Sequence, residues 1–232
     1  MTAAPESLKR LLADAGRVLA HEGQGDYVAG HISLRLPDDP GLFLMKPAGI
    51  GLEEMTHDNI ITVNIEGDKV GGASPRHNEV FIHSEVLRAR LDVQAVVHTH
   101  AIHAVVFSSL GKPLLPVSND AAFFAGGLPV FSETTDLIIT SARGRAVART
   151  LGTHGALILR NHGIVTAAPS VEEAVFLALK LNQACHAQVM AAMAGGPVLV
   201  GEPADAKAKG AYANRRDIHV NTFNYVLRKS HR

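Results

Sequence analysis

Three histidines follow short apolar segments at a spacing that is typical of metal sites. The segment 95–97 runs directly into the pattern His98-x-His100. Residues i and i+2 of an extended chain point to the same side, so His98 and His100 can present two imidazoles to one ion. A catalytic metal site with an open position needs a third protein ligand. The best candidate is His162, which follows the apolar segment 157–159.

A second group of polar residues stands where the apolar spacing of residues 78–90 predicts a helix. The first turn of a helix offers free N–H groups and the positive end of the dipole, which favour anions. Arg76 and His77 add further donors there. Glu79 is close enough in sequence to His98 for a helix and a turn to return its carboxylate to the metal. The alternative is that Glu79 only caps the helix.

The chain has thirteen histidines and no tryptophan, which is unusual because a buried imidazole needs partners for both ring nitrogens. We expect most of these histidines to lie on the surface. For His103, on a helix face, and His154, in a turn, simple solvation is the expectation.

Composition places the chain among ordinary globular proteins, with 47 % apolar and 19 % charged residues in 232. The 22 basic and 22 acidic side chains cancel, which argues against a nucleic-acid partner. The single cysteine, Cys185, cannot form an internal disulfide, and neither a signal peptide nor a membrane-spanning run is evident. We therefore expect a cytoplasmic protein with a small-molecule substrate and no membrane partner.

The elements that must position these residues follow from apolar periodicity and turn residues. In the first half the pattern predicts helices over 8–22 and 78–90, strands over 31–36, 42–45 and 95–97, a turn at 37–41, and a hairpin joining 59–64 to 69–70.

In the second half it predicts helices over 101–110, 136–151 and 170–194, an extended segment at 114–117, strands over 156–159 and 164–166, and a turn at 161–163. Ser170 and Glu173 form a capping box at the start of the longest helix. After Pro203 the chain is polar and less regular, with a final short element at 217–227. We expect one α/β domain over 1–232, with a core of about 8–195, a tail at 203–232, and a central mostly antiparallel sheet flanked by helices.

Five motifs occur in an order and spacing that resemble the class II aldolase/adducin family. They are Gly30-His31-Ile32-Ser33, Lys46-Pro47-Ala48-Gly49, Asn78-Glu79, Val97-His98-Thr99-His100-Ala101-Ile102-His103 and Asn161-His162-Gly163-Ile164. The resemblance implies an antiparallel sheet covered by helices, and a tetramer with active sites near the subunit interfaces. It also implies one divalent ion per subunit on His98, His100 and His162, with Glu79 as acid/base. The adducin branch lacks the metal ligands, whereas this chain keeps all three, which favours an enzyme.

Departures from the family pattern lie where aldolases bind a substrate phosphate through an asparagine and several hydroxyls. This chain has His31, Ala48, His77 and Asn78 at those positions. Planar imidazole donors suit a carboxylate on a flat ring, and Arg76 could bind it with two hydrogen bonds.

Lys46 and Gly49, which belong to the same motif as Ala48, are predicted to line the substrate site. For Lys46 the competing and favoured expectation is a solvated loop lysine.

A further departure concerns the leaving group. Our alignment places Asp120 where the aldolases have a tyrosine that handles the proton of the departing aldehyde. A reaction that releases CO2 needs no such donor. The chain is therefore more similar to the family's decarboxylases of hydroxylated aromatic or pyridine dicarboxylates.

The function that this pattern favours is a metal-dependent carbon–carbon lyase, specifically a decarboxylase that proceeds through an enolate stabilised by the metal. Glu79 would supply or relay a proton to the ring, which requires a raised pKa. Three imidazoles accept zinc, manganese or cobalt, so the sequence does not select the ion. Two alternatives stay open: an aldolase for a hydroxy-carbonyl substrate with or without phosphate, and a non-catalytic scaffold of the adducin type.

Overall fold

A computed structural model describes residues 5–196 and 199–231. Its helices are α1 (Glu6–Leu19), α2 (Val80–Ala89), α3 (Ile102–Ser109), α4 (Ser141–Leu151), α5 (Val171–Met193), α6 (Pro203–Ala213) and α7 (Arg216–Ser230). Its strands are β1 (His31–Leu36), β2 (Asp39–Met45), β3 (Ile61–Asn64), β4 (Lys69–Gly71), β5 (Ala95–Thr99), β6 (Val130–Phe131), β7 (Ala156–Leu159) and β8 (Gly163–Ala168). Two irregular helical turns, η1 (Ala20–Gln24) and η2 (Asn119–Phe124), complete the elements.

The strands form one eight-stranded sheet in the order β4-β3-β2-β1-β5-β8-β7-β6. Every pair of neighbours is antiparallel except β6 with β7. In the centre, His31 of β1 is paired with His98 of β5, and Thr99 is paired with Ile164 of β8. The predicted mostly antiparallel α/β fold is confirmed, and the central strands bring residues distant in sequence to one end of the sheet.

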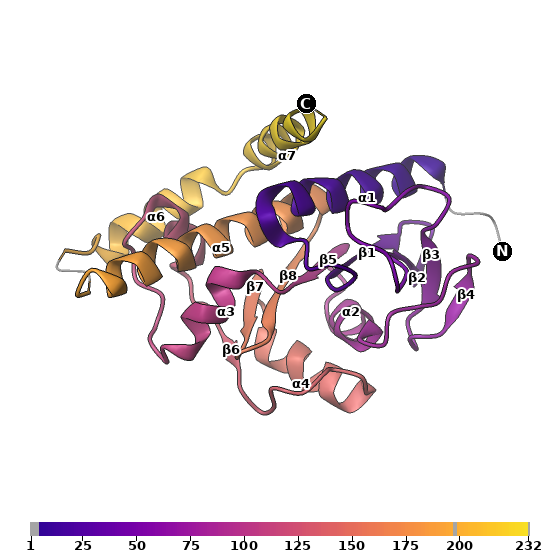
Figure 1. The fold of residues 1–232 in the computed structure, drawn as a ribbon, viewed down its shortest axis with the longest axis horizontal. Helices are drawn as coiled ribbons and strands as arrows, with labels where there is room; N and C mark the ends of the chain where they lie inside the picture. The colour runs from indigo at the N-terminus through magenta and orange to yellow at the C-terminus, as the bar shows by residue number, and fades with distance from the viewer. Residues whose placement is uncertain (1–4, 197–198, 232) are drawn as a thin grey trace.

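Helices cover the two faces of this sheet unequally (Figure 1). One apolar core joins the sheet to α1, α3, α5 and α7, and a second joins the other face to α2 and α4. Side chains alternate between faces along a strand, so Ile32, Leu34 and Leu36 enter the first core. His31 and Ser33, at the positions between them, are directed toward α2, where both lie near His83.

Most predicted elements are present, with ends shifted by a few residues. The helix predicted at 8–22 is α1 continued by η1, and it ends near Gly23, whose φ of 75° suits glycine. Ser170 accepts a hydrogen bond from the Glu173 N–H at 3.2 Å, as the capping box predicts. The strand predicted at 42–45 begins earlier, at Asp39.

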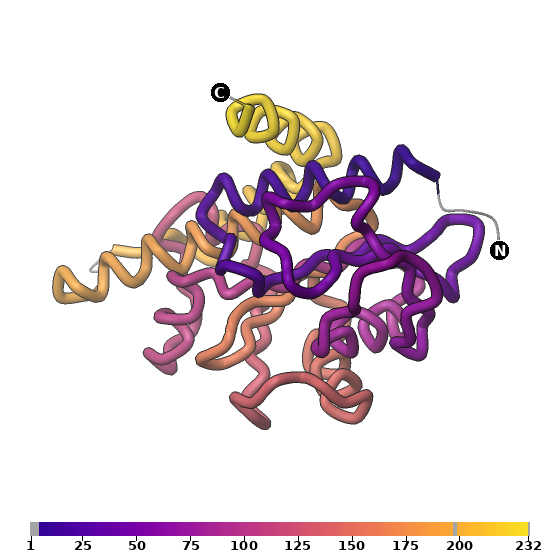
Figure 2. Tube along the Cα trace, turned by 45° about the vertical axis from the view of Figure 1, so that its right-hand side comes forward, coloured from indigo at the N-terminus to yellow at the C-terminus, as the bar shows by residue number. Residues whose placement is uncertain are grey.

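Two expectations about elements are wrong, and two elements are not predicted. Residues 136–140 precede α4 instead of forming its first turn, because Thr140 is the N-cap and accepts from the Arg143 N–H. The chain after Pro203 is not irregular but forms α6 and α7; the element predicted at 217–227 is present within α7 and is longer than predicted. Both views place α7 beside α1 (Figures 1 and 2). Finally, β6 and η2 were not foreseen. In the described ranges, none of the helices has the length and apolar character needed to cross a membrane.

Candidate active site

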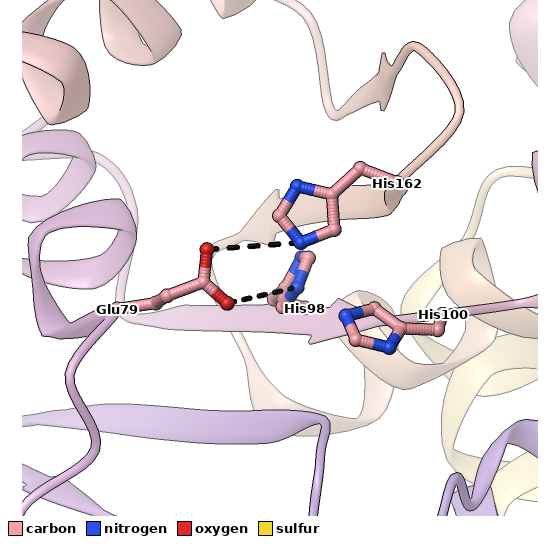
Figure 3. A group of neighbouring side chains, drawn as sticks. All are labelled: Glu79, His98, His100 and His162. Carbon is pink, nitrogen blue, oxygen red and sulfur yellow. Dashed lines mark ion pairs between the residues drawn. The ribbon is translucent and has the colours of Figure 1, made fainter. Parts of the chain in front are cut away.

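Four predicted site residues meet at the end of the central strands. Glu79 lies at the start of α2, His98 at the end of β5, His100 just beyond it, and His162 in the turn between β7 and β8 (Figure 3). One nitrogen or oxygen atom from each of the four lies within 4.8 Å of the others. The Nε2 atoms of His98 and His162 are 4.0 Å and 3.7 Å from the two carboxylate oxygens of Glu79.

The groups behind two of these imidazoles determine which nitrogen faces the site. His98 Nδ1 lies 2.9 Å from the Ile164 carbonyl, and His100 Nδ1 lies 2.8 Å from Asp26 Oδ2. A carbonyl or carboxylate oxygen only accepts, so both Nδ1 atoms carry the proton and both Nε2 atoms present a lone pair. Metal-binding histidines commonly have such partners.

The buried Nε2 atoms of His98, His100 and His162 have no hydrogen-bond partner among the described residues. Buried polar atoms are rarely left without a partner, and converging imidazole lone pairs are suitable ligands for a divalent ion. The site therefore fits the metal that the sequence predicts.

Glu79 is held by the backbone of a distant segment. Its Oε1 accepts a hydrogen bond from the Ile138 N–H at 2.8 Å, and the carboxylate makes no hydrogen bond that caps α2. Burial alone would raise the pKa of Glu79, but His162, His98 and the Ile138 N–H together lower it to about 2. The sequence-based expectation of a raised pKa is therefore wrong for the group as it lies here.

His31 occupies the centre of a second set of imidazoles. Its ring centroid lies 4.2 Å from that of His77 and 4.8 Å from those of His83 and His98. Burial lowers the pKa of His31 well below 6.5, that of His77 to about 4 and that of His83 to about 3. These rings are therefore neutral and offer hydrogen bonds rather than charge.

Lys46 is fully buried, so the expectation of a solvated loop lysine is wrong. Its Nζ donates to the Val28 carbonyl at 2.9 Å and to the Pro47 carbonyl at 3.4 Å. Burial lowers the pKa of Lys46 to about 8. It forms no ion pair with a carboxylate in the described part of the chain, and its charge acts on both His31 and His77.

The other predicted substrate contacts are less central. The Arg76 guanidinium lies over the Phe81 ring and donates to the His77 carbonyl. Asn78 is exposed, and Gly49 is exposed with a φ of 84° that accounts for glycine in this turn.

The structure also shows the surroundings of His103 and His154, which were expected on the surface, and of Asp120, which aligns with the aldolase tyrosine. His103 stacks on His186 at 4.0 Å and is half-buried, so simple solvation is wrong for His103, whereas His154 keeps part of its surface exposed in its turn. Asp120 accepts a hydrogen bond from Lys180 at 2.8 Å.

Sequence reasoning missed four residues that contact this site: Asp26, Ser33, His83 and Ile138. His83 follows Glu79 by one helical turn, a spacing that could have indicated it. Ile138 acts through its backbone N–H, for which a sequence carries no signal.

Comparison with known proteins agrees with this geometry. The family model described as "Class II Aldolase and Adducin N-terminal domain" matches residues 10–189. The structure of L-fuculose 1-phosphate aldolase from Glaciozyma antarctica PI12 superposes with a TM-score of 0.85 at 29 % identity, covering 99 % of this chain and 92 % of that one. The chain belongs to the class II aldolase/adducin family.

Two curated relatives represent different branches of the family. A 3,4-dihydroxyphthalate decarboxylase from Arthrobacter keyseri is 31 % identical, over 81 % of this chain and 80 % of that protein. Alpha-adducin from Rattus norvegicus is also 31 % identical over 81 % of this chain, but the match spans only 26 % of adducin. Sequence identity alone therefore does not separate an enzyme from a scaffold.

Proposed function

We propose that this protein is a metal-dependent carboxy-lyase that removes CO2 from a hydroxylated aromatic or pyridine dicarboxylate. The observation that carries the proposal is the buried Lys46 ammonium. Among the described residues it forms no ion pair, although Glu53 and Glu54 farther away favour its charged form, and its charge acts on the same imidazoles that border the metal cluster. Burying an unpaired charge is costly, so an anion supplied by a ligand is the natural counterpart.

His98, His100 and His162 would hold the ion, one per subunit. When bound, a divalent ion supplies a Lewis acid that stabilises negative charge developing on a substrate oxygen by several kcal/mol. Three imidazoles accept zinc, manganese or cobalt. Asp26 and the Ile164 carbonyl keep the imidazoles of His100 and His98 oriented for this role.

Glu79 moves the proton. It takes the proton of a ring hydroxyl and delivers it to the ring carbon that bears the departing carboxylate. The electron pair of the broken carbon–carbon bond returns to the hydroxyl oxygen as CO2 leaves, and solvent protonates that oxygen afterwards. The Ile138 N–H fixes Oε1, which leaves Oε2 for the transfer.

The second carboxylate would bind on the opposite side, to Lys46, His31 and His77. The Glu79 N–H donates to His77 Nδ1 at 3.4 Å, so His77 presents its Nε2–H as a donor. Arg76, whose guanidinium lies over Phe81, would reach this carboxylate by leaving that ring, and the exposed Asn78 and Gly49 would line the entrance.

An aldolase reaction is the second candidate, because the aldolase from Glaciozyma antarctica has the same fold and the metal and Glu79 could serve it equally. Against it, Asp120 is paired with Lys180 at the position where aldolases have their tyrosine. A scaffold of the adducin type would not need three unpartnered imidazoles. By analogy with the family, we also propose a homotetramer in the cytoplasm with active sites near the subunit interfaces.

A direct comparison of substrates tests the proposal. Protein loaded with zinc, manganese or cobalt is assayed for CO2 release from 3,4-dihydroxyphthalate and for aldehyde release from a ketose 1-phosphate. We expect CO2 release, and the Glu79→Gln variant should keep the metal but lose about 10²–10⁴-fold in rate. Faster cleavage of the ketose phosphate would establish the aldolase alternative, and failure to bind any of the three ions would favour the scaffold.

A further inference from the structure

Behind His31 lies a chain of two hydrogen bonds that the proposed reaction does not use. His31 Nδ1 lies 2.6 Å from His83 Nε2, and His83 Nδ1 lies 2.7 Å from Ser33 Oγ. All three residues are fully buried. The chain ends on the site side at His31 Nε2, which is buried without a partner among the described residues.

Such a chain can run in two directions. In one, the Ser33 hydroxyl donates to His83 Nδ1, His83 Nε2–H donates to His31 Nδ1, and His31 presents an Nε2–H to the site. In the other, every proton is shifted, His31 presents a lone pair, and Ser33 only accepts.

The surroundings of Ser33 favour the first direction. Within the described ranges, its hydroxyl makes no hydrogen bond other than the one to His83. In the reverse direction the hydroxyl proton would have no acceptor in the protein interior, which is unfavourable.

The surroundings of His31 favour the same direction independently. One ligating atom each of His31, His77 and Glu79 lies within 4.8 Å of the others. A carboxylate nearby stabilises an N–H and repels a lone pair. Both ends of the chain therefore indicate the same orientation.

We infer that Ser33 and His83 act as positioning residues that fix His31 as an Nε2–H donor toward an anionic acceptor in the site. This assignment contrasts with His98 and His100, behind which an oxygen acceptor leaves Nε2 as a lone pair. The group that contacts the Nδ1 atom of each imidazole thus determines whether its Nε2 can bind a metal ion or can donate a hydrogen bond to the substrate. It also excludes His31 as a metal ligand through Nε2.

Nuclear magnetic resonance of protein with ¹⁵N-labelled histidine tests the tautomers directly, because protonated and unprotonated ring nitrogens differ strongly in chemical shift. In the metal-free protein at neutral pH we expect His31 protonated at Nε2, and His98 and His100 protonated at Nδ1. The His31→Asn variant assigns the His31 signals. A His31 ring protonated at Nδ1 would overturn the inference.

Variants of Ser33 test whether the two hydrogen bonds through His83 set the tautomer of His31. Ser33→Ala should give a mixture of His31 tautomers, and Ser33→Thr, which keeps the hydroxyl, should restore the single form. Ser84→Ala is the matched control, since Ser84 is equally buried and its hydroxyl has no partner among the described residues. An unchanged His31 spectrum in Ser33→Ala would contradict a role for the hydroxyl.

Binding of phthalate, an unreactive aromatic dicarboxylate, measures the consequence for the ligand. Calorimetry should show about tenfold weaker binding to Ser33→Ala and no change for Ser84→Ala, since one charge-assisted hydrogen bond is impaired. This step rests on the proposed function. If the wild-type protein does not bind phthalate, the proposed carboxylate-binding site is wrong. The tautomers seen in the spectra still show whether Ser33 and His83 orient His31.

Discussion

At the scale of single residues, the atoms that can bind a metal ion are distinct from the atoms that can bind a substrate anion. His98 and His100 have acceptors behind them, whereas Lys46 offers an ammonium that forms no ion pair within the described residues. Removing a metal ligand should change the metal content of the protein, whereas removing a nearby histidine that is not a ligand should not. We expect His98→Ala to lose the metal while the fold persists, and His103→Ala to keep it. Metal analysis after gel filtration measures both; stoichiometric metal in His98→Ala would refute the ligand assignment.

Asp26 should influence the metal through His100. Asp26→Ala removes the acceptor of the His100 Nδ1–H, and loss of such a partner weakens metal binding by 10–100-fold in general. Because the Asp26 side chain is 43 % exposed, water can replace it in part, and we expect about tenfold. Competition with a chelator measures the affinity. Asp26→Asn should recover part of the loss and Asp38→Ala, at an exposed acid, should show none.

The buried charge of Lys46 should lower the stability of the fold and should strengthen the binding of an anion. Lys46→Met removes a buried charge that has no ion pair among the described residues, so we expect a higher thermal midpoint and weaker phthalate binding. Folding lowers the pKa of Lys46 from 10.5 to about 8. Between these values the unfolded chain binds more protons, so the stability of wild type rises with pH and its deficit against the variant shrinks. A less stable variant would contradict this account.

The residues that the sequence identified and those it missed differ in a physical way. The pattern His98-x-His100 is visible because ligand type and strand periodicity coincide. Lys46 was misjudged because a loop sequence does not reveal whether a long side chain points inward. Ile138 contributes only an N–H, which every residue except proline has.

At the scale of elements, the site depends on how closely β5 and β8 approach. A Cβ on Gly163 would lie 2.4 Å from the Thr99 carbonyl oxygen and 3.2 Å from the His100 ring. Gly163→Ala should therefore push the two strands apart beside the metal ligands. We expect a stability loss of about 1–3 kcal/mol, typical of overpacking, together with weaker metal binding.

Denaturant unfolding and chelator competition check this prediction. Gly126→Ala is the control, because nothing lies within 4 Å of a Cβ at that position. Equal stability and metal affinity for Gly163→Ala and wild type would show that the strand contact does not determine the site.

Elements with regular apolar spacing were predictable, and those without it were not. α5 carries a capping box and a long apolar pattern. By contrast, α6 is built largely from alanine, lysine and glycine, and β6 has two residues, so neither gives a periodic signal. The apolar pattern predicts the start of α4 too early, because Thr140, a suitable N-cap, continues that pattern as if it were helix interior.

At the scale of the whole molecule, the C-terminal helices complete the core without reaching the site. Phe223 and Val226 of α7 are buried in the same apolar cluster as residues of α1 and α5. The polar composition of α6 and α7 hides this role, because two or three buried residues per helix are enough when neighbouring helices supply the remaining contacts. The number of subunits has no comparable signal in one chain, so the proposed tetramer rests on analogy with the family.

This separation of core from site gives the last prediction. Phe223 is 3 % exposed, and Phe223→Ala should lower the free energy of unfolding by about 3–5 kcal/mol, the usual cost of removing a buried phenylalanine side chain. Metal affinity measured on the folded variant should be unchanged, because α7 lies on the face of the sheet opposite α2 and Glu79. Tyr225→Ala, at a side chain 59 % exposed, is the matched control and should change stability little. A variant that stays fully stable would place α7 outside the cooperative core, and one that loses metal while folded would show that the helix supports the site from across the sheet.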